Sequence, residues 1–196
     1  MQRALSRAVR GADAVIVSDY GSGVIDASMM RKALRRAGRR KPLVFVDSRY
    51  AMLSFKGMTA TTPNESEVEA QLGVTIGDNL KALERAGRML VKKMRVETVL
   101  ITRGSRGMAL FQPGQRTEHI PIVGSDEVAD VTGAGDTVIA TFALALAAGA
   151  TYREAAHLAN HAGGVVVMKR GTATVSRVEL AASVAAEGDA AEVFGG

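Results

Sequence analysis

Residues 129–137 read Ala-Asp-Val-Thr-Gly-Ala-Gly-Asp-Thr, and we expect the rest of the chain to be organised around this stretch. Two glycines flank an alanine, so the backbone can turn tightly and approach a ligand closely. An apolar helical run, residues 138–148, follows at once. The turn therefore directs backbone N–H groups and the positive end of a helix dipole at a ligand, which favours an anion. Asp136 lies in the first helical turn, where it either caps the helix or acts as a base.

The composition is typical of a globular protein with one domain and a sizeable core. Of the 196 residues, 47% are hydrophobic and 23% are charged, and the low aromatic content of 4% predicts a core of Val, Leu, Ile, Ala and Met. Cysteine is absent, which excludes a disulfide framework and thiolate chemistry. No apolar run approaches the roughly 20 residues that span a bilayer. The first residues also lack the apolar segment of a signal peptide. We therefore expect a cytoplasmic protein and no membrane partner.

A run of basic residues at 31–41 contributes strongly to the net charge of +5. One interpretation is a nucleic-acid-binding patch. The other is a solvated helix face whose last cations complement the helix dipole. Aromatic residues for base stacking are missing from this run, so we favour the solvated face and expect no nucleic-acid partner.

Apolar runs and helical periodicity alternate along the chain, which predicts an α/β fold. Strands buried on both faces are expected at 14–18 and 43–47, further strands at 59–62 and 98–102, and an antiparallel hairpin at 108–120. Helices are expected at 27–38, at 65–72 with Asn64 as N-cap, at 79–94 with Asp78 as N-cap, and at 134–148, 151–168 and 176–186. The pattern indicates a mostly parallel sheet, with residues 1–186 as a single domain and residues 187–196 as a frayed tail.

Polar side chains follow several of the expected strands. They are Asp19, Asp47, Asn64 with Glu67, and the Thr102–Gly104 segment. In an open parallel sheet, ligands bind beyond the carboxyl ends of the strands. Combined with the glycine-rich turn, this arrangement favours a phosphate-bearing ligand. The turn contains neither the Gly-Lys-Ser/Thr of a P-loop nor the G-x-G-x-x-G of a dinucleotide fold.

Four motifs, in order along the chain, resemble those of the ribokinase-like (PfkB-type) carbohydrate kinases. They are Thr-Pro-Asn-Glu-Ser-Glu at 62–67, Ile-Thr-Arg-Gly-Ser-Arg-Gly at 101–107, Asp-Val-Thr-Gly-Ala-Gly-Asp-Thr at 130–137, and Leu-Ala-Asn at 158–160 with Gly-Thr-Ala-Thr at 171–174. Within that family, residues 18–21 and 171–174 most resemble the heptose-7-phosphate kinase branch, although Ser22 stands where that branch usually has Lys. The resemblance implies a three-layer α/β/α core that lacks the family's N-terminal strands and lid, which carry most sugar contacts.

The resemblance also implies phosphoryl transfer from ATP to a hydroxyl of a small sugar or sugar phosphate. Asp136 would be the general base, and the backbone N–H groups of Gly133, Ala134 and Gly135 would form an anion hole. This agrees with the chemistry of phosphoryl transfer, in which positioning and electrostatic stabilisation dominate.

The remaining motif positions are implied to bind nucleotide and metal. Asn64 and Glu67 would organise Mg²⁺ and the phosphates, with the carboxylate acting through water. The nucleotide site would be lined by Thr102 and Gly104, with Asn160 near the adenine. Two further residues match positions that hold a monovalent cation such as K⁺ in many relatives: Asp130 and Thr132.

Each assignment has a structural alternative. Asn64 is also typical of an N-cap, Glu67 and Asn160 of helix surfaces, and Asp19 of a strand-end turn that makes no substrate contact. The i, i+4 spacing of His157 and His161 permits zinc binding, but no third ligand stands out, which favours an ordinary helix surface or interface.

Two expectations concern the chain as a whole. A sheet without its first strands would expose an apolar edge, so we expect a homo-oligomer. The alternative to an active kinase is a catalytically inactive nucleotide-binding remnant or an interaction module.

Overall fold

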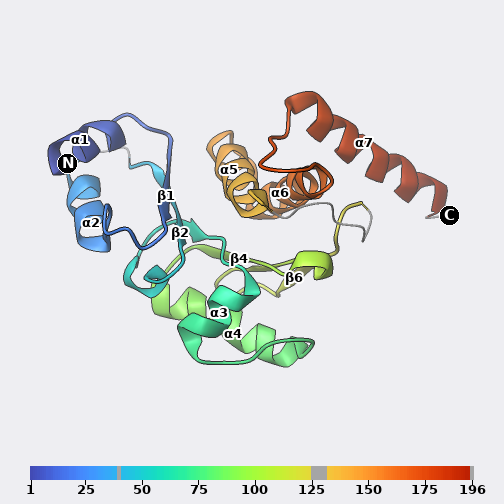
Figure 1. The fold of residues 1–196 in the computed structure, drawn as a ribbon, viewed down its shortest axis with the longest axis horizontal. Coiled ribbons are helices and arrows are strands. Elements are labelled where there is room, and N and C mark those ends of the chain that lie inside the picture. Colours follow the sequence, from blue (N-terminus) through green and yellow to red (C-terminus); the bar gives the residue numbers. More distant parts are fainter. Residues whose placement is uncertain (39–40, 125–131, 195–196) are drawn as a thin grey trace. The chain divides into compact units, whose positions relative to one another are not determined.

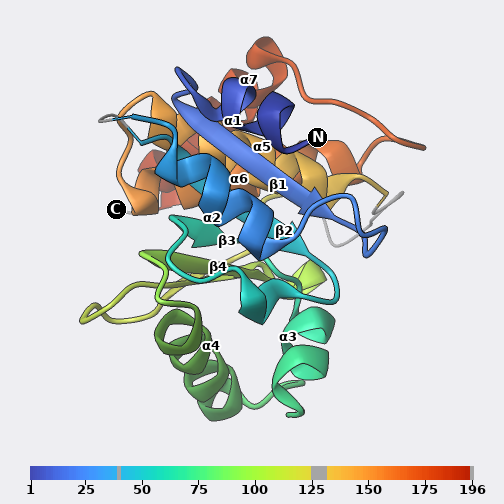
Figure 2. The ribbon, with the colours of Figure 1, turned by 90° about the vertical axis from the view of Figure 1, so that its left-hand side faces the viewer.

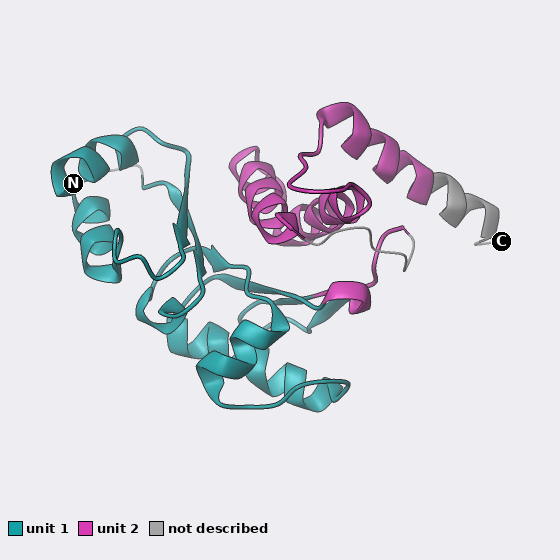
Figure 3. Cartoon of the chain, in the orientation of Figure 1, with its two compact units in different colours: residues 1–103, 109–119 teal, residues 104–108, 120–196 magenta. Residues whose placement is uncertain are grey.

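The computed structural model describes residues 1–38, 41–124 and 132–194 of the chain (Figure 1). The chain divides into two compact units (Figure 3): residues 1–103 with 109–119, and residues 104–108 with 120–196. Among the described helices, none combines the length and apolar character that a bilayer crossing requires.

Six strands form one sheet in the order β1-β2-β3-β4-β5-β6. They span Ala14–Asp19 (β1), Leu43–Ser48 (β2), Ala60–Thr61 (β3), Thr98–Thr102 (β4), Met108–Phe111 (β5) and Glu118–Ile120 (β6). The first four strands pair in parallel, as expected, and Asp19 at the end of β1 lies opposite Ser48 at the end of β2. The polar residues that follow these strands therefore lie along one edge of the sheet.

The edge strand β1 departs from the expectation that it is buried on both faces. Ile16 is 41% exposed, whereas Val17, its neighbour on the opposite face, is 5% exposed. Among the described strands, only β2 lies beside β1, and the apolar run at 14–17 cannot reveal this because strand order is not a local property. The expectation of double-sided burial is wrong for β1.

The first unit also contains four helices and one 3₁₀ turn. They are α1 (Gln2–Val9), α2 (Ala27–Arg35), η1 (Met52–Ser54), α3 (Glu65–Leu72) and α4 (Leu80–Met94). Figure 2 shows α3 and α4 on the same side of β4, with α1 and α2 next to each other near β1.

The start of α4 corrects one expected cap. Asn79, and not Asp78, is the N-cap, because its side-chain oxygen accepts a hydrogen bond from Ala82 N at 3.0 Å. Both residue types are good N-caps, so local preference does not choose between them. The choice follows from the helix register that buries Leu83 and Leu90.

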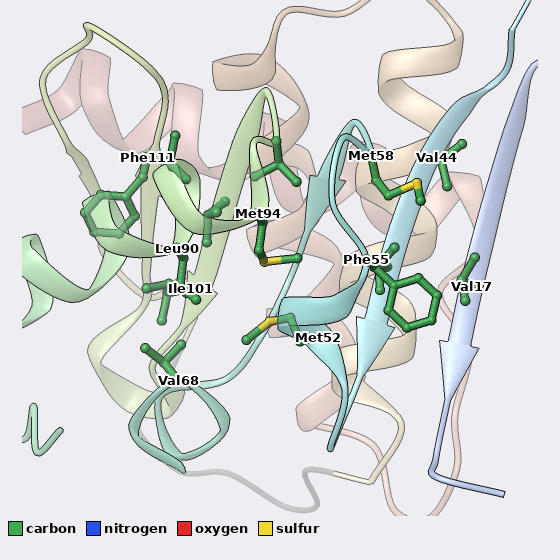
Figure 4. Packing of buried hydrophobic residues seen from close by; sticks show 14 of the residues in the cluster. Val17, Val44, Met52, Phe55, Met58, Val68, Leu90, Met94, Ile101 and Phe111 are labelled. Carbon is green, nitrogen blue, oxygen red and sulfur yellow. The ribbon is translucent and has the colours of Figure 1, made fainter. Parts of the chain in front are cut away.

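The core of the first unit is assembled from strands, η1 and α4 (Figure 4). Val44 and Ile101 of the sheet lie in the same cluster as Met52, Phe55 and Met94. Burying a side chain of this size stabilises the fold by about 1.5–3 kcal/mol. The composition predicted a core of Val, Leu, Ile, Ala and Met, but four phenylalanines are among the largest side chains that are fully buried: Phe45, Phe55, Phe111 and Phe142.

The second unit is mainly helical. It contains η2 (Gly104–Arg106), α5 (Ala134–Ala147), α6 (Tyr152–Val167) and α7 (Arg177–Phe194). Thr151 and Glu154 form a capping box at the start of α6. Ser176 and Glu179 exchange the same pair of hydrogen bonds at the start of α7, which extends beyond the expected end at 186. The middle helix, α6, packs against both α5 and α7.

Gly87 in α4 provides a test of core packing. A methyl group on Gly87 would lie 2.5 Å from ring carbons of Phe111, which is fully buried. Overpacking costs about 1–3 kcal/mol, while alanine gains about 1 kcal/mol of helix propensity. We therefore expect Gly87→Ala to lower the free energy of unfolding by roughly 1 kcal/mol in urea denaturation. In a Phe111→Leu background the same change should cost less, because the smaller side chain makes room. A Gly87→Ala variant as stable as the parent would contradict this contact.

Candidate functional site

The first unit brings together three of the candidate residues, Asn64, Glu67 and Thr102. Asn64 begins α3 with a capping box: its Oδ1 accepts from Glu67 N at 2.9 Å, and Glu67 Oε2 accepts from Asn64 N at 3.0 Å. Thr102, at the end of β4, forms a parallel bridge with Asn64 and donates its N–H to Pro63 O at 3.0 Å. The N-cap interpretation of Asn64 is therefore confirmed, and its side chain is held at the carboxyl end of β4.

Behind this cluster lies an ion pair that the sequence analysis did not identify. Arg103 is 9% exposed, and its Nε donates to Glu65 Oε2 at 2.8 Å. A second guanidinium N–H donates to Gly77 O at 3.1 Å. The pair links the end of β4 to the first turn of α3. From the sequence alone, an arginine after one strand and a glutamate at the start of a helix only weakly predict an ion pair. The pairing of β3 with β4 is what brings these two residues together.

Asp19 occupies a strand-end turn. Its Oδ1 accepts from Gly21 N at 2.9 Å, and its Oδ2 accepts from Ser48 Oγ at 2.8 Å. The Ser48 hydroxyl in turn accepts from Ala51 N at 3.1 Å. Since Asp19 is 8% exposed and both its oxygens serve neighbouring turns, these contacts support the structural alternative.

In the second unit, the described end of the glycine-rich turn leads directly into α5. Gly133 is the N-cap of α5 with a left-handed φ of +79°, and its carbonyl accepts from Thr137 N at 3.0 Å. A first helical turn leaves its N–H groups without partners inside the helix, and glycine offers no side chain to accept them. The exposed first turn also carries Asp136.

An open pocket of about 590 Å³ adjoins this turn. It is lined by Gly133 and Asp136, by Thr172 and Ser176 of the loop before α7, and by the apolar side chains of Leu144 and Leu180. This volume is within the range of small-ligand sites, about 300–1,000 Å³. Of the lining residues, Leu180 was not anticipated, because its place depends on how α7 packs.

Asn160 and Gly104 lie in the same unit but have different surroundings. Asn160 is 4% exposed, and its Nδ2 donates to Pro121 O at 2.7 Å, so the surface alternative is wrong for Asn160. Gly104 begins η2 with a left-handed φ of +58°, and its carbonyl accepts from Gly107 N at 3.1 Å. Thr132 is described as an exposed turn residue, whereas Asp130 lies outside the described residues.

One of the two histidines on α6, His161, lies at the interface with α7. His161 is 3% exposed, and its ring nitrogens lie 2.8 Å from Ser183 Oγ and 2.6 Å from Glu187 Oε2, both on α7. No cluster of three or more metal-ligating side chains occurs in the part of the chain that is described. The helix-interface interpretation of His161 is thus confirmed.

The loop between α6 and α7 is held by Lys169. Its Nζ donates to Thr174 O at 2.8 Å and lies 2.6 Å from Glu179 Oε1. The hydrogen bond from Lys169, reinforced by those from Ser176, lowers the pKa of Glu179 to about 2 from its ordinary value of 4.5. Because residues 172–176 line the pocket, this ion pair supports one wall of it.

The residues of both units fit the groups that the sequence suggested. The α5 N-terminus suits a phosphate. The capping box occupies only Glu67 Oε2, so the other carboxylate oxygen is compatible with a hydrated Mg²⁺, which usually keeps several waters.

Comparison with known proteins identifies relatives over nearly the whole chain. The model of the pfkB family of carbohydrate kinases matches residues 2–179. "Bifunctional protein HldE" of Trichlorobacter lovleyi is 42% identical over 184 residues, which are 93% of this chain and 37% of the relative. The protein of the same name from Aeromonas salmonicida is 44% identical over 90% of this chain and 36% of the relative. The chain thus spans little more than a third of these curated relatives.

Solved structures confirm the ribokinase-like α/β fold. Arabidopsis thaliana ribokinase, complexed with ribose and ATP, is 26% identical with a TM-score of 0.77, over 91% of this chain and 58% of that one. Escherichia coli phosphofructokinase-2, in complex with potassium, is 18% identical with a TM-score of 0.79, over 94% of this chain and 60% of that one. The second likeness supports the fold alone.

The buried ion pair between Arg103 and Glu65 predicts a large stability effect. Arg103→Met would leave the Glu65 carboxylate buried without its guanidinium, and breaking such a pair costs about 3–5 kcal/mol. Urea denaturation should show this loss, and adding Glu65→Leu should recover most of it. Lys32→Met, which removes an exposed cation, should change the stability by less than about 0.5 kcal/mol. A loss below about 1 kcal/mol in Arg103→Met would contradict the proposed energetics.

The carboxyl group of Glu179 should titrate unusually low. Its pKa is depressed in the folded state, so the ion pair with Lys169 stabilises the protein above about pH 4.5, and this contribution is lost as pH falls towards about 2. Carboxyl ¹³C NMR between pH 2 and 6 should place the midpoint near 2, and Lys169→Met should raise it. Lys92→Met, in the other unit, is the matched control and should leave it unchanged. A wild-type midpoint near 4.5 would show that the ion pair does not form in solution.

Proposed function

Because the chain belongs to the pfkB family of carbohydrate kinases, we propose that it transfers the γ-phosphoryl group of ATP to a hydroxyl of a sugar or sugar phosphate. One observation carries this proposal above the others. The first turn of α5 opens on Gly133 in a left-handed conformation, and Asp136 of the same turn lines the adjoining pocket. An anion-binding backbone and a carboxylate that can accept a proton thus stand within one helical turn.

In the proposed reaction, Asp136 accepts the proton of the attacking hydroxyl. The hydroxyl oxygen forms a bond to the γ-phosphorus while the bond from that phosphorus to the ADP oxygen breaks. The backbone N–H groups of Gly133, Ala134 and Gly135 donate to the oxygens on which charge develops. Such preorganised donors are usually the largest catalytic contribution in reactions of this kind.

The proposal assigns five residues to the nucleotide and Mg²⁺. Asn64 and Glu67 orient the phosphates and Mg²⁺, which when bound neutralises charge developing on the phosphate oxygens. Thr102 and Gly104 line the nucleotide. We assign the side-chain oxygen of Asn160 to the adenine side, since its Nδ2 is engaged by Pro121.

A cation and an acceptor complete the proposal. Asp130 and Thr132 are assigned to a monovalent cation such as K⁺. A heptose 7-phosphate is the proposed acceptor, on the strength of residues 18–21 and 171–174. We further propose a cytoplasmic location, and a homo-oligomer in which the exposed β1 edge is covered.

The second candidate function is nucleotide binding without catalytic activity. The two candidates share ATP binding and differ in phosphoryl transfer, which makes them separable in one experiment.

Asp136→Asn tests the proposed base. General-base catalysis contributes about 10²–10⁴-fold, so the variant should lose at least about 100-fold in kcat for phosphoryl transfer from ATP to heptose 7-phosphate. Its affinity for Mg-ATP, measured by calorimetry, should stay within about threefold of wild type, because the amide keeps the size of the carboxylate.

Asp26→Asn is the matched control. Asp26 caps α2 in the first unit, and asparagine caps equally well, so its activity should equal that of wild type. Turnover by Asp136→Asn at the wild-type rate would remove Asp136 from the base role. Mg-ATP binding without turnover by the wild-type chain would favour the inactive alternative, and no binding at all would refute both.

A further inference from the structure

A short backbone segment, residues 120–123, lies against both the turn at 104–107 and helix α6 of the second unit. We call this segment the strap. It follows β6 and ends at Val123, ten residues before Gly133 in the sequence. Two glycines and one asparagine, far from the strap in sequence, contact its backbone.

The helix α6 holds the strap through two neighbouring positions on one face. Asn160 donates its Nδ2–H to Pro121 O at 2.7 Å. One turn later, a methyl group on Gly164 would lie 2.6 Å from Val123 O, closer than real contacts allow. Gly164 therefore leaves room for the strap backbone, and Asn160 bonds it in place.

The turn at 104–107 contacts the strap backbone at Gly107. A methyl group there would collide with Ile120 O and lie 2.8 Å from Pro121 C. Gly107 also donates its N–H to the carbonyl of Gly104, at 3.1 Å, which closes the turn. Any displacement of the strap is thus transmitted to the turn that contains Gly104.

The same part of α6 contacts α5 directly after its first turn. A methyl group on Gly163 would lie 3.2 Å from Val138 Cγ2, and Val138 is 3% exposed. Val138 follows Asp136 by two residues. One turn of α6 therefore supports both the strap and the helix that presents the proposed base.

We infer that Asn160 and Gly164 are positioning residues, which fix the strap so that the 104–107 turn and the first turn of α5 keep one mutual placement. The inference rests on the proposed function for its catalytic consequence, but its structural content is independent. Neither residue needs to touch a reacting atom. Displacing catalytic groups by about 1 Å can cost about 100-fold in rate, so contacts of this kind matter to kcat.

The test is Gly164→Ala in the full chain, read by amide NMR and by kinetics. The added methyl group should displace the strap and shift the amide resonances of both residues 104–107 and residues 134–137. The kcat for phosphoryl transfer should fall about 10–100-fold, while the KM for ATP changes by less than about threefold. Asn160→Ala, which removes the hydrogen bond to Pro121 and adds no bulk, should shift the same two sets of amides to a smaller extent and serves if Gly164→Ala does not fold. Its KM for ATP is not a readout, because Asn160 is also assigned to the adenine.

Arg153→Ala, on the exposed first turn of α6, is the control and should leave both sets of amides in place. Shifts confined to α6 and the strap in the folded variants would overturn the inference, as would a fall in kcat without shifts at the two turns. The amide shifts decide the matter even for a chain that phosphorylates no sugar, so failure of the proposed function and failure of this inference remain distinguishable.

Discussion

The first turn of α5 sets the constraint on which the candidate site depends. Its N–H groups have no acceptors inside the helix, and Gly133 offers no side chain to supply one. Most other described helices begin with a side-chain acceptor: Asp26, Asn64, Asn79, Thr151 and Ser176. The left-handed φ at Gly133 would strain a larger residue, so the same glycine that removes the cap also makes the turn possible. The first N–H groups of α5 therefore have no side-chain acceptor at the N-cap.

The second unit packs through close approach of backbones at glycines of α6. With few aromatic side chains to fill space, α6 uses alanines and glycines on its inner face, and its neighbours come near enough for dispersion contacts to replace bulk. The absence of a side chain at Gly163 leaves space for the side chain of Val138, and its absence at Gly164 leaves space for the carbonyl of Val123. Packing of this kind is specific because it fails when one methyl group is added. It also makes the placement of the α5 turn a property of α6.

The sequence anticipated features that depend on local chemistry. Apolar runs located β2 and β4, and the side chain of Asn64, a good N-cap, located the start of α3. Features that depend on distant partners escaped it. Asn160 bonds Pro121, 39 residues away, and Arg103 pairs with Glu65, 38 residues away. The exposure of Ile16 depends on what covers that face of β1, which no window of sequence contains.

Two interpretations of Asn64 and Glu67, helix cap and ligand contact, are compatible on physical grounds. The capping box uses Oδ1 of Asn64 and Oε2 of Glu67, which leaves the amide N–H groups of one and an oxygen of the other. The cap holds both side chains in one rotamer, so binding of a ligand there would cost little further side-chain conformational entropy. The buried Arg103–Glu65 pair fixes the same helical turn to β4, where Thr102 bridges to Asn64. The capping role of these residues is therefore compatible with ligand contact, because the hydrogen bonds that begin α3 also preorganise its first turn.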